Sequence, residues 1–214
     1  MKVIVAGGSG LVGTELLKIL SAEAKISSII TLTRRPIGTH LPKVTEQVVD
    51  FENLPMEAFE NSDTVFCCLG TTIKKAGSKP AFEKVDFEYP KNLALAAKKA
   101  GVKSYALVSS MGANINSGIF YSKVKGKTEK AVSDSGIPQI GIFRPSLLLG
   151  DRQEYRFAEK VSAALMNVFS FIIPKKYRGI QAGTVANAML NFVLSDKNGV
   201  KIIESDLIQE MVTT

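Results

Sequence analysis

The chain has 214 residues, of which 45% are hydrophobic and 22% are charged, and its formal net charge is +7. This length predicts one compact domain, and the apolar fraction is too high for a disordered chain. No stretch of the sequence approaches the ~20 apolar residues that a membrane span requires, so we expect no contact with a membrane.

The few residues that could build a metal site or a disulfide are poorly placed for either. Cys67 and Cys68 are adjacent, and the single histidine, His40, stands in a loop, where we expect a plain surface residue. We therefore expect no bound metal. The N-terminus passes directly into glycines without the features of a signal peptide, which predicts a cytoplasmic protein.

Short runs rich in Val and Ile alternate with longer stretches of helical periodicity. In chain order we predict a strand at 2–6, a helix from 11 to 20, strands at 29–33, 44–49 and 64–69, a helix at 80–100, a strand at 104–109, a helix at 118–135 and a strand at 139–143. Further helices are expected at 151–173 and near 184–194, before a short C-terminal element.

Near-continuous apolar strands separated by helices indicate a doubly wound α/β fold, a Rossmann-like parallel sheet with helices on both faces. We expect a single domain over 1–214. Residues 1–150 would form its nucleotide-binding core, and 151–214 would form a small substrate cap together with the last sheet elements. The apolar stripe at 161–173 could be a lid, a dimer face or core packing, so a homodimer stays open.

The first strand runs into a glycine-rich turn with the spacing G-x-x-G-x-x-G. Its residues are Gly7, Gly8, Ser9, Gly10, Leu11, Val12 and Gly13. Without Cβ atoms, such a turn lets backbone N–H groups approach a pyrophosphate at the positive end of a helix dipole. Because it follows an apolar strand at the start of a βαβ unit, the turn predicts a dinucleotide-binding site rather than an ordinary tight turn.

The second strand ends in Thr33, Arg34 and Arg35, where an NAD-binding unit would carry an acidic residue. Two guanidinium groups suit the 2′-phosphate of NADP, so NADP is favoured over NAD; the alternative is a pair of solvated arginines. Asp50 could accept a hydrogen bond from the adenine amino group, and Phe51 could line the slot for the ring. The next strand end adds the candidate cofactor contacts Cys68, Leu69, Gly70 and Thr71.

The fifth strand ends in Ser109 and Ser110, and the next helix carries Tyr121 and Lys125, four residues apart and so on one face. A lysine ammonium ~4 Å from the phenol, at an effective dielectric constant of ~20, favours the phenolate by ~4 kcal/mol, or ~3 pKa units. Tyr121 could then donate a proton to a carbonyl oxygen held by Ser110, or less favourably by Ser109, while a nicotinamide supplies hydride. The alternative is an ordinary surface helix.

Together these segments resemble the short-chain dehydrogenase/reductase superfamily, in its atypical, NmrA-like NAD(P)H-binding branch. The resemblance is to the family of the Tat-interacting-protein oxidoreductase and its bacterial relatives. The segments that carry it are 7–13, 67–72, 84–87, 108–110, Tyr121 with Lys125 and Gly126, 143–146 and 149–152.

The resemblance implies a Rossmann fold with NADP in its groove and a catalytic set of Ser110, Tyr121 and Lys125. It also implies that Lys125 bonds the nicotinamide ribose and that Arg144, Pro145 and Ser146 lie beside the nicotinamide. The function expected is an NADP-dependent oxidoreductase acting on a small carbonyl or alcohol substrate. The alternative is an NADP(H)-binding redox sensor or regulatory protein without turnover.

A nucleic-acid partner is not expected, although the net charge of +7 alone would permit one. The basic residues are not interleaved with aromatic side chains that could stack on bases, and only 7% of the residues are aromatic. Attraction of an anionic cofactor, or solubility, accounts for the charge more simply.

Overall fold

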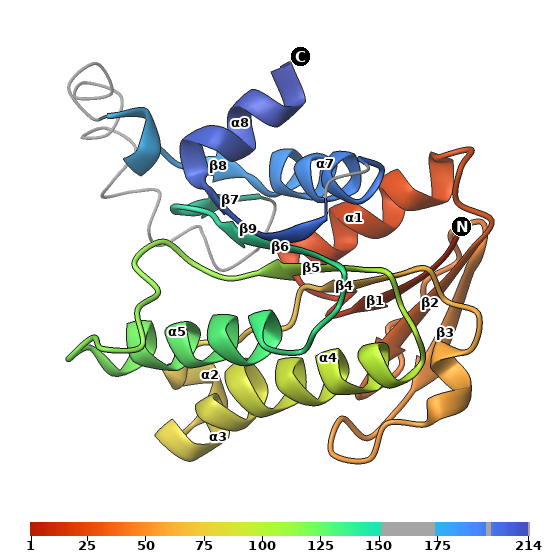
Figure 1. The fold of residues 1–214 in the computed structure, drawn as a ribbon, viewed down its shortest axis with the longest axis horizontal. Helices are drawn as coiled ribbons and strands as arrows, with labels where there is room; N and C mark the ends of the chain where they lie inside the picture. Colours follow the sequence, from red (N-terminus) through yellow and green to blue (C-terminus); the bar gives the residue numbers. More distant parts are fainter. Residues whose placement is uncertain (151–173, 196–197, 214) are drawn as a thin grey trace.

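The computed structural model describes residues 1–150, 174–195 and 198–213. Its main feature is a seven-stranded sheet in the order β3-β2-β1-β4-β5-β6-β9, with every neighbouring pair parallel (Figure 1). The strands are β1 (Lys2–Ala6), β2 (Ser28–Thr33), β3 (Val44–Val48), β4 (Thr64–Cys67), β5 (Ser104–Val108), β6 (Gln139–Arg144) and β9 (Gly199–Glu204). A short second sheet pairs β7 (Leu148–Leu149) with β8 (Ile180–Gln181).

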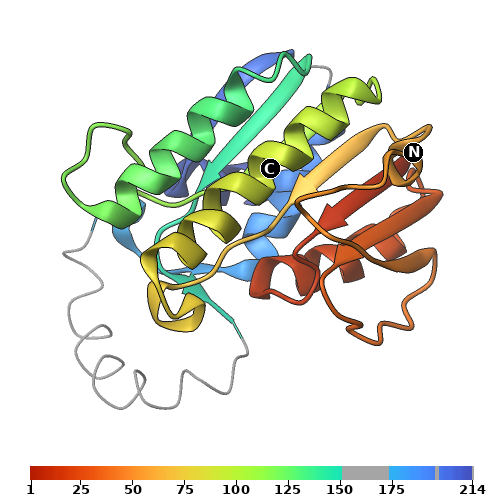
Figure 2. The same cartoon turned by 90° about the horizontal axis from the view of Figure 1, so that it is seen from below.

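Helices cover both faces of this sheet. Figure 1 shows α1 (Leu11–Ala22), α7 (Ala182–Val193) and α8 (Ser205–Thr213) on one face, and α4 (Tyr89–Lys99) and α5 (Phe120–Ser133) on the other. In Figure 2, seen from below, α4 and α5 run side by side across their face. The predicted Rossmann-like α/β fold is confirmed.

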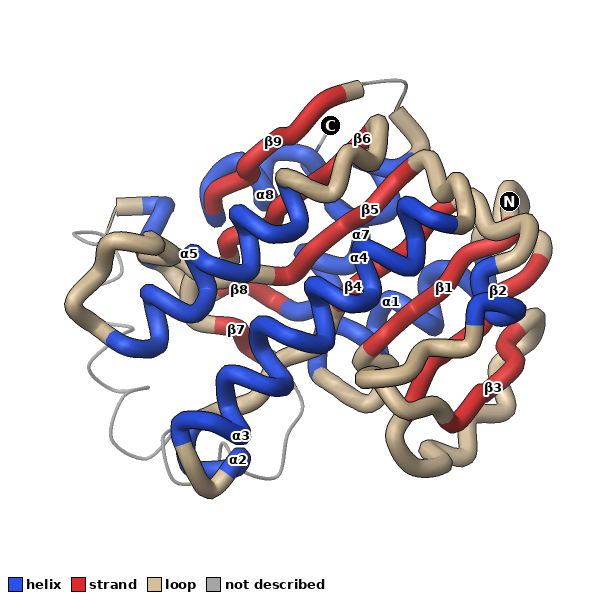
Figure 3. The backbone as a smooth tube through the Cα atoms, turned by 60° about the horizontal axis from the view of Figure 1, so that its bottom comes forward, coloured by secondary structure: helices blue, strands red, loops and turns tan. Residues whose placement is uncertain are grey.

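The central strands are buried on both sides, which explains their near-continuous apolar sequences. In β1, Val3 and Val5 belong to the core beneath α1 and α7, whereas Ile4 and Ala6 belong to the core beneath α4. Because all strands are parallel, the loops that follow β1, β2, β4, β5 and β6 lie at one edge of the sheet, as the tube in Figure 3 shows. The strand order reverses between β1 and β4, which is where such folds bind ligands.

The helix predicted at 80–100 is helical throughout but has three parts: α3 (Lys79–Glu83), a π-helical turn at Lys84–Glu88, and α4. The predicted helix is confirmed, and the π-helical turn within it is a feature that the sequence did not predict. Pro90 has no N–H with which to bond the carbonyl of Asp86 four residues earlier. That carbonyl instead accepts a hydrogen bond from Thr128 Oγ1 of α5, at 2.6 Å.

The C-terminal part contributes more to the core than a cap would. α7 packs against α1, and β9 extends the sheet beyond β6. Strand β9 and α8 together make up the short C-terminal element expected from the sequence. The helix predicted at 151–173, with its apolar stripe, lies outside the described residues. Within the described residues, no helix has the length and hydropathy needed to cross a membrane.

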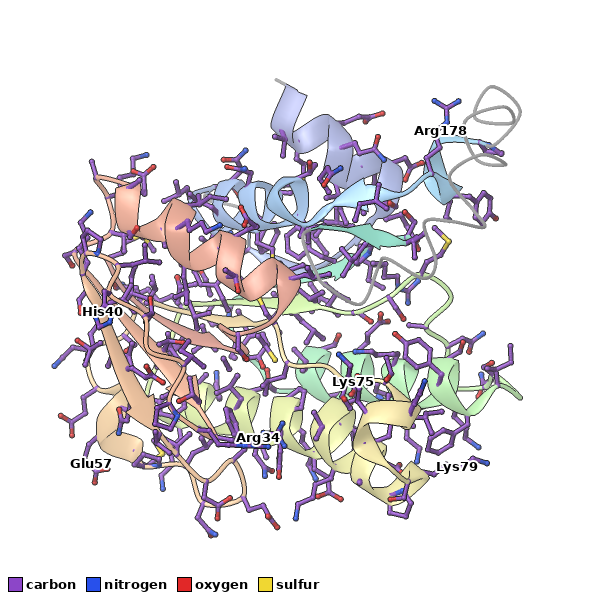
Figure 4. All side chains as sticks on the ribbon, turned by 180° about the vertical axis from the view of Figure 1, so that it is seen from behind. Arg34, His40, Glu57, Lys75, Lys79 and Arg178 are labelled. Atoms are coloured by element: carbon purple, nitrogen blue, oxygen red, sulfur yellow. The ribbon has the colours of Figure 1, made fainter. Side chains whose placement is uncertain are left out.

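The remaining short elements connect the strands. Helix α2 (Ile73–Ala76) follows β4, and 3-10 turns occupy Met56–Phe59 and Lys175–Tyr177. His40, labelled in Figure 4, is exposed on the connection between β2 and β3. No group of residues suited to hold a metal ion occurs in the part of the chain that the structure describes.

Candidate active site

The glycine turn between β1 and α1 is built so tightly that side chains cannot enter it. Gly7 has a φ of +89°, and a Cβ there would lie 2.5 Å from the carbonyl oxygen of Cys68. A Cβ on Gly13 would overlap the carbonyl oxygen of Gly7. Gly10 caps α1 without a side-chain hydrogen bond, and the first turn of α1 carries no acidic residue. The free N–H groups at this helix end therefore suit an anion such as a pyrophosphate.

Two adjoining cavities run from this turn along the edge of the sheet. The first, of about 310 Å³, reaches Arg34, Arg35 and Phe51; we call it the arginine end. The second, of about 260 Å³, reaches Tyr121 and Lys125; we call it the tyrosine end. Gly10, Cys68, Leu69 and Gly70 line both cavities, so the two form one continuous groove. Thr71 and Ser109 also line the tyrosine end.

At the arginine end, Arg34 and Arg35 are exposed on the loop after β2, where Figure 4 labels Arg34. The carboxylate of Glu46 on β3 shapes this loop, because it accepts hydrogen bonds from the backbone N–H groups of Ile37 (2.5 Å) and Gly38 (3.1 Å). Glu46 thus holds the loop just after the two arginines, whose own side chains are exposed.

The two residues predicted to contact adenine are placed differently. Phe51 is buried, lines the groove, and stacks on Tyr89 with ring centroids 5.3 Å apart. Asp50 is exposed and is not among the residues that line either cavity. Its carboxylate accepts hydrogen bonds from the backbone of Glu52 (2.9 Å) and from Asn53 Nδ2 (3.0 Å), and these bonds lower the pKa of Asp50. Its predicted contact with adenine stays a prediction.

At the tyrosine end, α5 brings Tyr121 and Lys125 to the same cavity, as their spacing predicts. The Tyr121 ring packs on Phe82 of α3 with centroids 5.6 Å apart. Close packing of α5 depends on Gly126, where a Cβ would overlap the backbone of the Asn114–Ile115 segment. Lys125 is 5% exposed, so the interpretation of this helix as an ordinary solvated surface is wrong for Lys125.

The charge of Lys125 is matched by Asp86 on the π-helical turn. Lys125 Nζ lies 2.8 Å from Asp86 Oδ1. Burial lowers the pKa of Lys125, but the attraction and hydrogen bond of the Asp86 carboxylate, with smaller contributions from Tyr121 and Cys67, together outweigh this effect, and the pKa is raised above its usual value of 10.5. Lys125 is therefore an ammonium group at neutral pH.

The two serines at the end of β5 have different surroundings. The Ser109 hydroxyl donates to Glu129 Oε1 at 2.5 Å. The Ser110 hydroxyl oxygen is buried and has no hydrogen-bond partner within the described residues, and Ser110 is not among the residues that line the groove. The Ser109 hydroxyl thus already donates its proton to a carboxylate of the protein, whereas the Ser110 hydroxyl donates to none of the described residues.

Arg144 ends β6, Pro145 and Ser146 follow it, and all three are held by other parts of the chain. Arg144 forms two hydrogen bonds with the Glu129 carboxylate, at 2.6 and 2.9 Å, and a third with Glu204 at 3.1 Å. The Ser146 hydroxyl bonds the carbonyl of Arg178 and accepts from Ser205. None of the three lines either cavity, so their position beside a nicotinamide stays a prediction.

Comparison with known proteins shows the family to which this chain belongs. The family model described as "Semialdehyde dehydrogenase, NAD binding domain" matches residues 2–89. Protein HTATIP2 of Rattus norvegicus is 35% identical over 212 residues, which cover 96% of this chain and 87% of that protein. The chain belongs to the HTATIP2 family. The predicted resemblance to the NAD(P)-binding, short-chain dehydrogenase/reductase-like proteins is confirmed.

Fungal members of the HTATIP2 family are similar over a shorter range. Protein FMP52, mitochondrial, of Debaryomyces hansenii is 39% identical over 158 residues, covering 72% of this chain and 70% of that protein. Because its name assigns that relative to mitochondria, the cytoplasmic location expected for the present chain stays a prediction.

Solved structures share the fold of this HTATIP2-family chain at low sequence identity. The structure "MoeE5 in complex with UDP-glucose and NAD" has a TM-score of 0.73 and 17% identity, over 95% of this chain and 75% of that chain. A UDP-N-acetylglucosamine 4-epimerase from Methanobrevibacter ruminantium M1, in complex with UDP-N-acetylmuramic acid, has a TM-score of 0.71 and 17% identity, over 95% and 76%. These likenesses confirm the Rossmann-like fold.

Sequence reasoning assigned no role to Asp86 or Glu129, the two buried carboxylates of this HTATIP2-family site. A signal for Glu129 exists, because it follows Tyr121 and Lys125 at a further four-residue step on the same face of α5. Asp86 is a charged residue among the inward-facing positions of the segment predicted as one helix. Charges at buried positions are rare unless they are paired.

Proposed function

We propose that this protein is an NADP-dependent oxidoreductase that transfers hydride between NADPH and a small carbonyl or alcohol substrate, with Tyr121 as the proton donor. The observation that carries the proposal is the continuous groove. One end presents Arg34 and Arg35, and the other presents Tyr121 beside the charged Lys125.

The residues along the groove fit this cofactor in their chemistry. The glycine turn, into which no Cβ fits, would hold the pyrophosphate, and Arg34 and Arg35 would bind the 2′-phosphate. Lys125 would donate to the nicotinamide ribose with an N–H that Asp86 does not use. When bound, NADPH supplies the hydride that the carbonyl carbon gains.

The chain's own residues supply and stabilise the proton. The phenol of Tyr121 donates its proton to the carbonyl oxygen as that carbon is reduced, and the resulting tyrosinate regains a proton from solvent. Ser110 rather than Ser109 would hold the carbonyl oxygen, because its hydroxyl has no partner in the described residues whereas the proton of Ser109 goes to Glu129. Since Ser110 lines neither cavity, this role requires its hydroxyl to turn toward the tyrosine end when substrate binds. In the reverse direction the tyrosinate accepts the proton of the alcohol.

The Asp86 carboxylate lies 2.8 Å from Lys125 Nζ, so its negative charge opposes the field of the ammonium at the phenol. Lys125 would therefore stabilise the tyrosinate less than a lone ammonium group would, and we assign Tyr121 the role of proton donor in the reduction.

The test is an NADPH-consumption screen with aldehydes and ketones, using the wild-type protein, Tyr121→Phe and Tyr177→Phe. Loss of a general acid lowers turnover by about 10²- to 10⁴-fold, so we expect that loss in Tyr121→Phe. Tyr177 is exposed and lines neither cavity, so Tyr177→Phe should match the wild type. If NADPH binds but no compound shows consumption that Tyr121→Phe abolishes, the protein is a sensor or regulatory protein without turnover.

A further inference from the structure

We propose that Asp86 is a positioning residue of this site. Its carboxylate keeps Lys125 in place as an ammonium group and also holds the loop after β4 through the backbone N–H of Thr71. The inference rests on the proposed function where it concerns turnover. The effect of Asp86 on the charge of Lys125 is a property of the folded protein and is measured without a substrate.

The side chain of Asp86 joins two different walls of the groove. Oδ1 lies 2.8 Å from Lys125 Nζ on α5. Oδ2 accepts a hydrogen bond from the backbone N–H of Thr71, also at 2.8 Å, in the loop after β4. The Asp86 side chain is 0% exposed and that of Lys125 is 7% exposed, so both interactions are shielded from water. One carboxylate thus fixes the lysine and the loop segment opposite it.

The backbone of Asp86 is attached to the same helix. Because Pro90 cannot donate to the Asp86 carbonyl, that oxygen is available to the Thr128 hydroxyl of α5, at 2.6 Å. Thr128 lies three residues after Lys125, so the side chain and the carbonyl of Asp86 contact α5 within one turn of each other. The π-helical turn is therefore attached to α5 at two points, and both place Asp86 beside Lys125.

The charge of Lys125 depends on this contact. Burial disfavours an ammonium group, and the other groups that act on Lys125 are the Tyr121 phenol on α5 and the buried Cys67 thiol on β4. The exposed Lys75 of α2 also lines the tyrosine end and adds positive charge to it. Asp86 is the only carboxylate among the described residues that line this end. Without its negative charge, burial would lower the pKa of Lys125, so the neutral amine would form at lower pH.

Asp86→Asn is a sharp test because it changes charge with little change in shape. The amide oxygen of the new side chain can still accept from Thr71 N–H, which turns its NH₂ group toward Lys125 Nζ. Two hydrogen-bond donors, the new NH₂ group and the Lys125 ammonium, then face each other. We expect the pKa of Lys125 to fall by at least about one unit, since burial is no longer offset.

The matched control is Glu83→Gln. Glu83 pairs with Lys127 at 2.7 Å, between α3 and α5, but the two side chains are 30% and 38% exposed. This variant removes a carboxylate that partners the same helix without touching either cavity. Asp86→Glu, which restores the charge, is the rescue variant.

The experiment is an NMR titration of isotope-labelled lysine side chains, assigned with Lys125→Arg, together with NADPH binding and kcat/KM as functions of pH. In the wild type we expect the pKa of Lys125 above 10.5. In Asp86→Asn we expect the lower pKa, an alkaline loss of kcat/KM that begins at correspondingly lower pH, and NADPH affinity that weakens over the same range. Glu83→Gln should leave all three unchanged, and Asp86→Glu should recover most of each.

The outcomes separate this inference from the proposed function. An unchanged Lys125 pKa in folded Asp86→Asn overturns the inference. If that variant does not fold, a wild-type Lys125 pKa at or below 10.5 overturns it, as does an Asp86→Glu variant that folds with a lowered Lys125 pKa. A Lys125 pKa that falls in Asp86→Asn, in a protein whose wild type reduces no carbonyl, supports the inference and contradicts the proposed function.

Discussion

The two ends of the groove hold their cations in opposite ways. Arg34 and Arg35 are exposed on a loop that Glu46 holds through the backbone of Ile37 and Gly38, whereas Lys125 is buried and paired with Asp86. Exposed cations suit attraction and recognition of a phosphate. A buried, paired cation suits chemistry that needs a fixed distance, because the packing that surrounds it leaves few alternative positions.

Helix α5 repeats this contrast within a single turn. Lys125 and Lys127 each pair with an acidic residue at 2.7 to 2.8 Å, but the side chains are 7% and 38% exposed. Equal distances therefore do not imply equal energies, since water screens the exposed pair and leaves the buried pair unscreened.

The largest expected effect comes from removing one member of the buried pair. Lys125→Met leaves the Asp86 carboxylate buried without a counter-ion, which should lower the free energy of unfolding by about 3 to 5 kcal/mol. Lys127→Met should lower it by less than ~1 kcal/mol. Urea denaturation measures both, and equal losses for the two variants would remove the distinction between the pairs.

A smaller loss is expected at the glycine turn, which both ends share. In Gly13→Ala the added Cβ meets the Gly7 carbonyl, so the turn must shift, at a cost of about 1 to 3 kcal/mol in stability and at least about tenfold in NADPH affinity. Gly118→Ala, where no atom lies within 4 Å of the added Cβ, is the control and should bind normally. Calorimetric titration with NADPH checks this, and undiminished binding by Gly13→Ala would contradict a pyrophosphate site here.

The most selective effect, a loss confined to one cofactor with no loss of stability, is expected at the arginine end. Arg34→Ala combined with Arg35→Ala should weaken NADPH binding by about 10- to 100-fold and leave NADH binding unchanged, because charged hydrogen bonds contribute about 1.5 to 3 kcal/mol. Lys123→Ala combined with Lys130→Ala, which removes two exposed cations of α5, controls for net charge. Equal losses for NADPH and NADH would end the assignment of these arginines to the 2′-phosphate.

The sequence predicted the sheet well because each central strand is buried on both faces and is therefore apolar along its length. It also predicted that Tyr121 and Lys125 share a cavity, since that depends on spacing within one helix. It did not predict the Asp86–Lys125 pair, which joins residues far apart in the chain and depends on how α5 packs. It also did not predict the ion pair of Arg144 with Glu129, which likewise depends on how α5 packs against the sheet.

The π-helical turn is a second feature that the sequence did not predict. The apolar periodicity of 80–100 is that of one helix, and Pro90 alone does not reveal how the freed carbonyl of Asp86 is satisfied. The partner, Thr128, belongs to another helix. The carbonyl that Pro90 leaves without its usual helical partner is thus satisfied by a tertiary hydrogen bond.

A crystal structure of the protein with NADPH tests the proposed site most directly. We predict the 2′-phosphate beside Arg34 and Arg35, the pyrophosphate on the glycine turn, and the nicotinamide in the cavity lined by Tyr121, with its ribose in contact with Lys125. A nicotinamide outside the tyrosine end, or a cofactor elsewhere on the protein, would contradict this prediction.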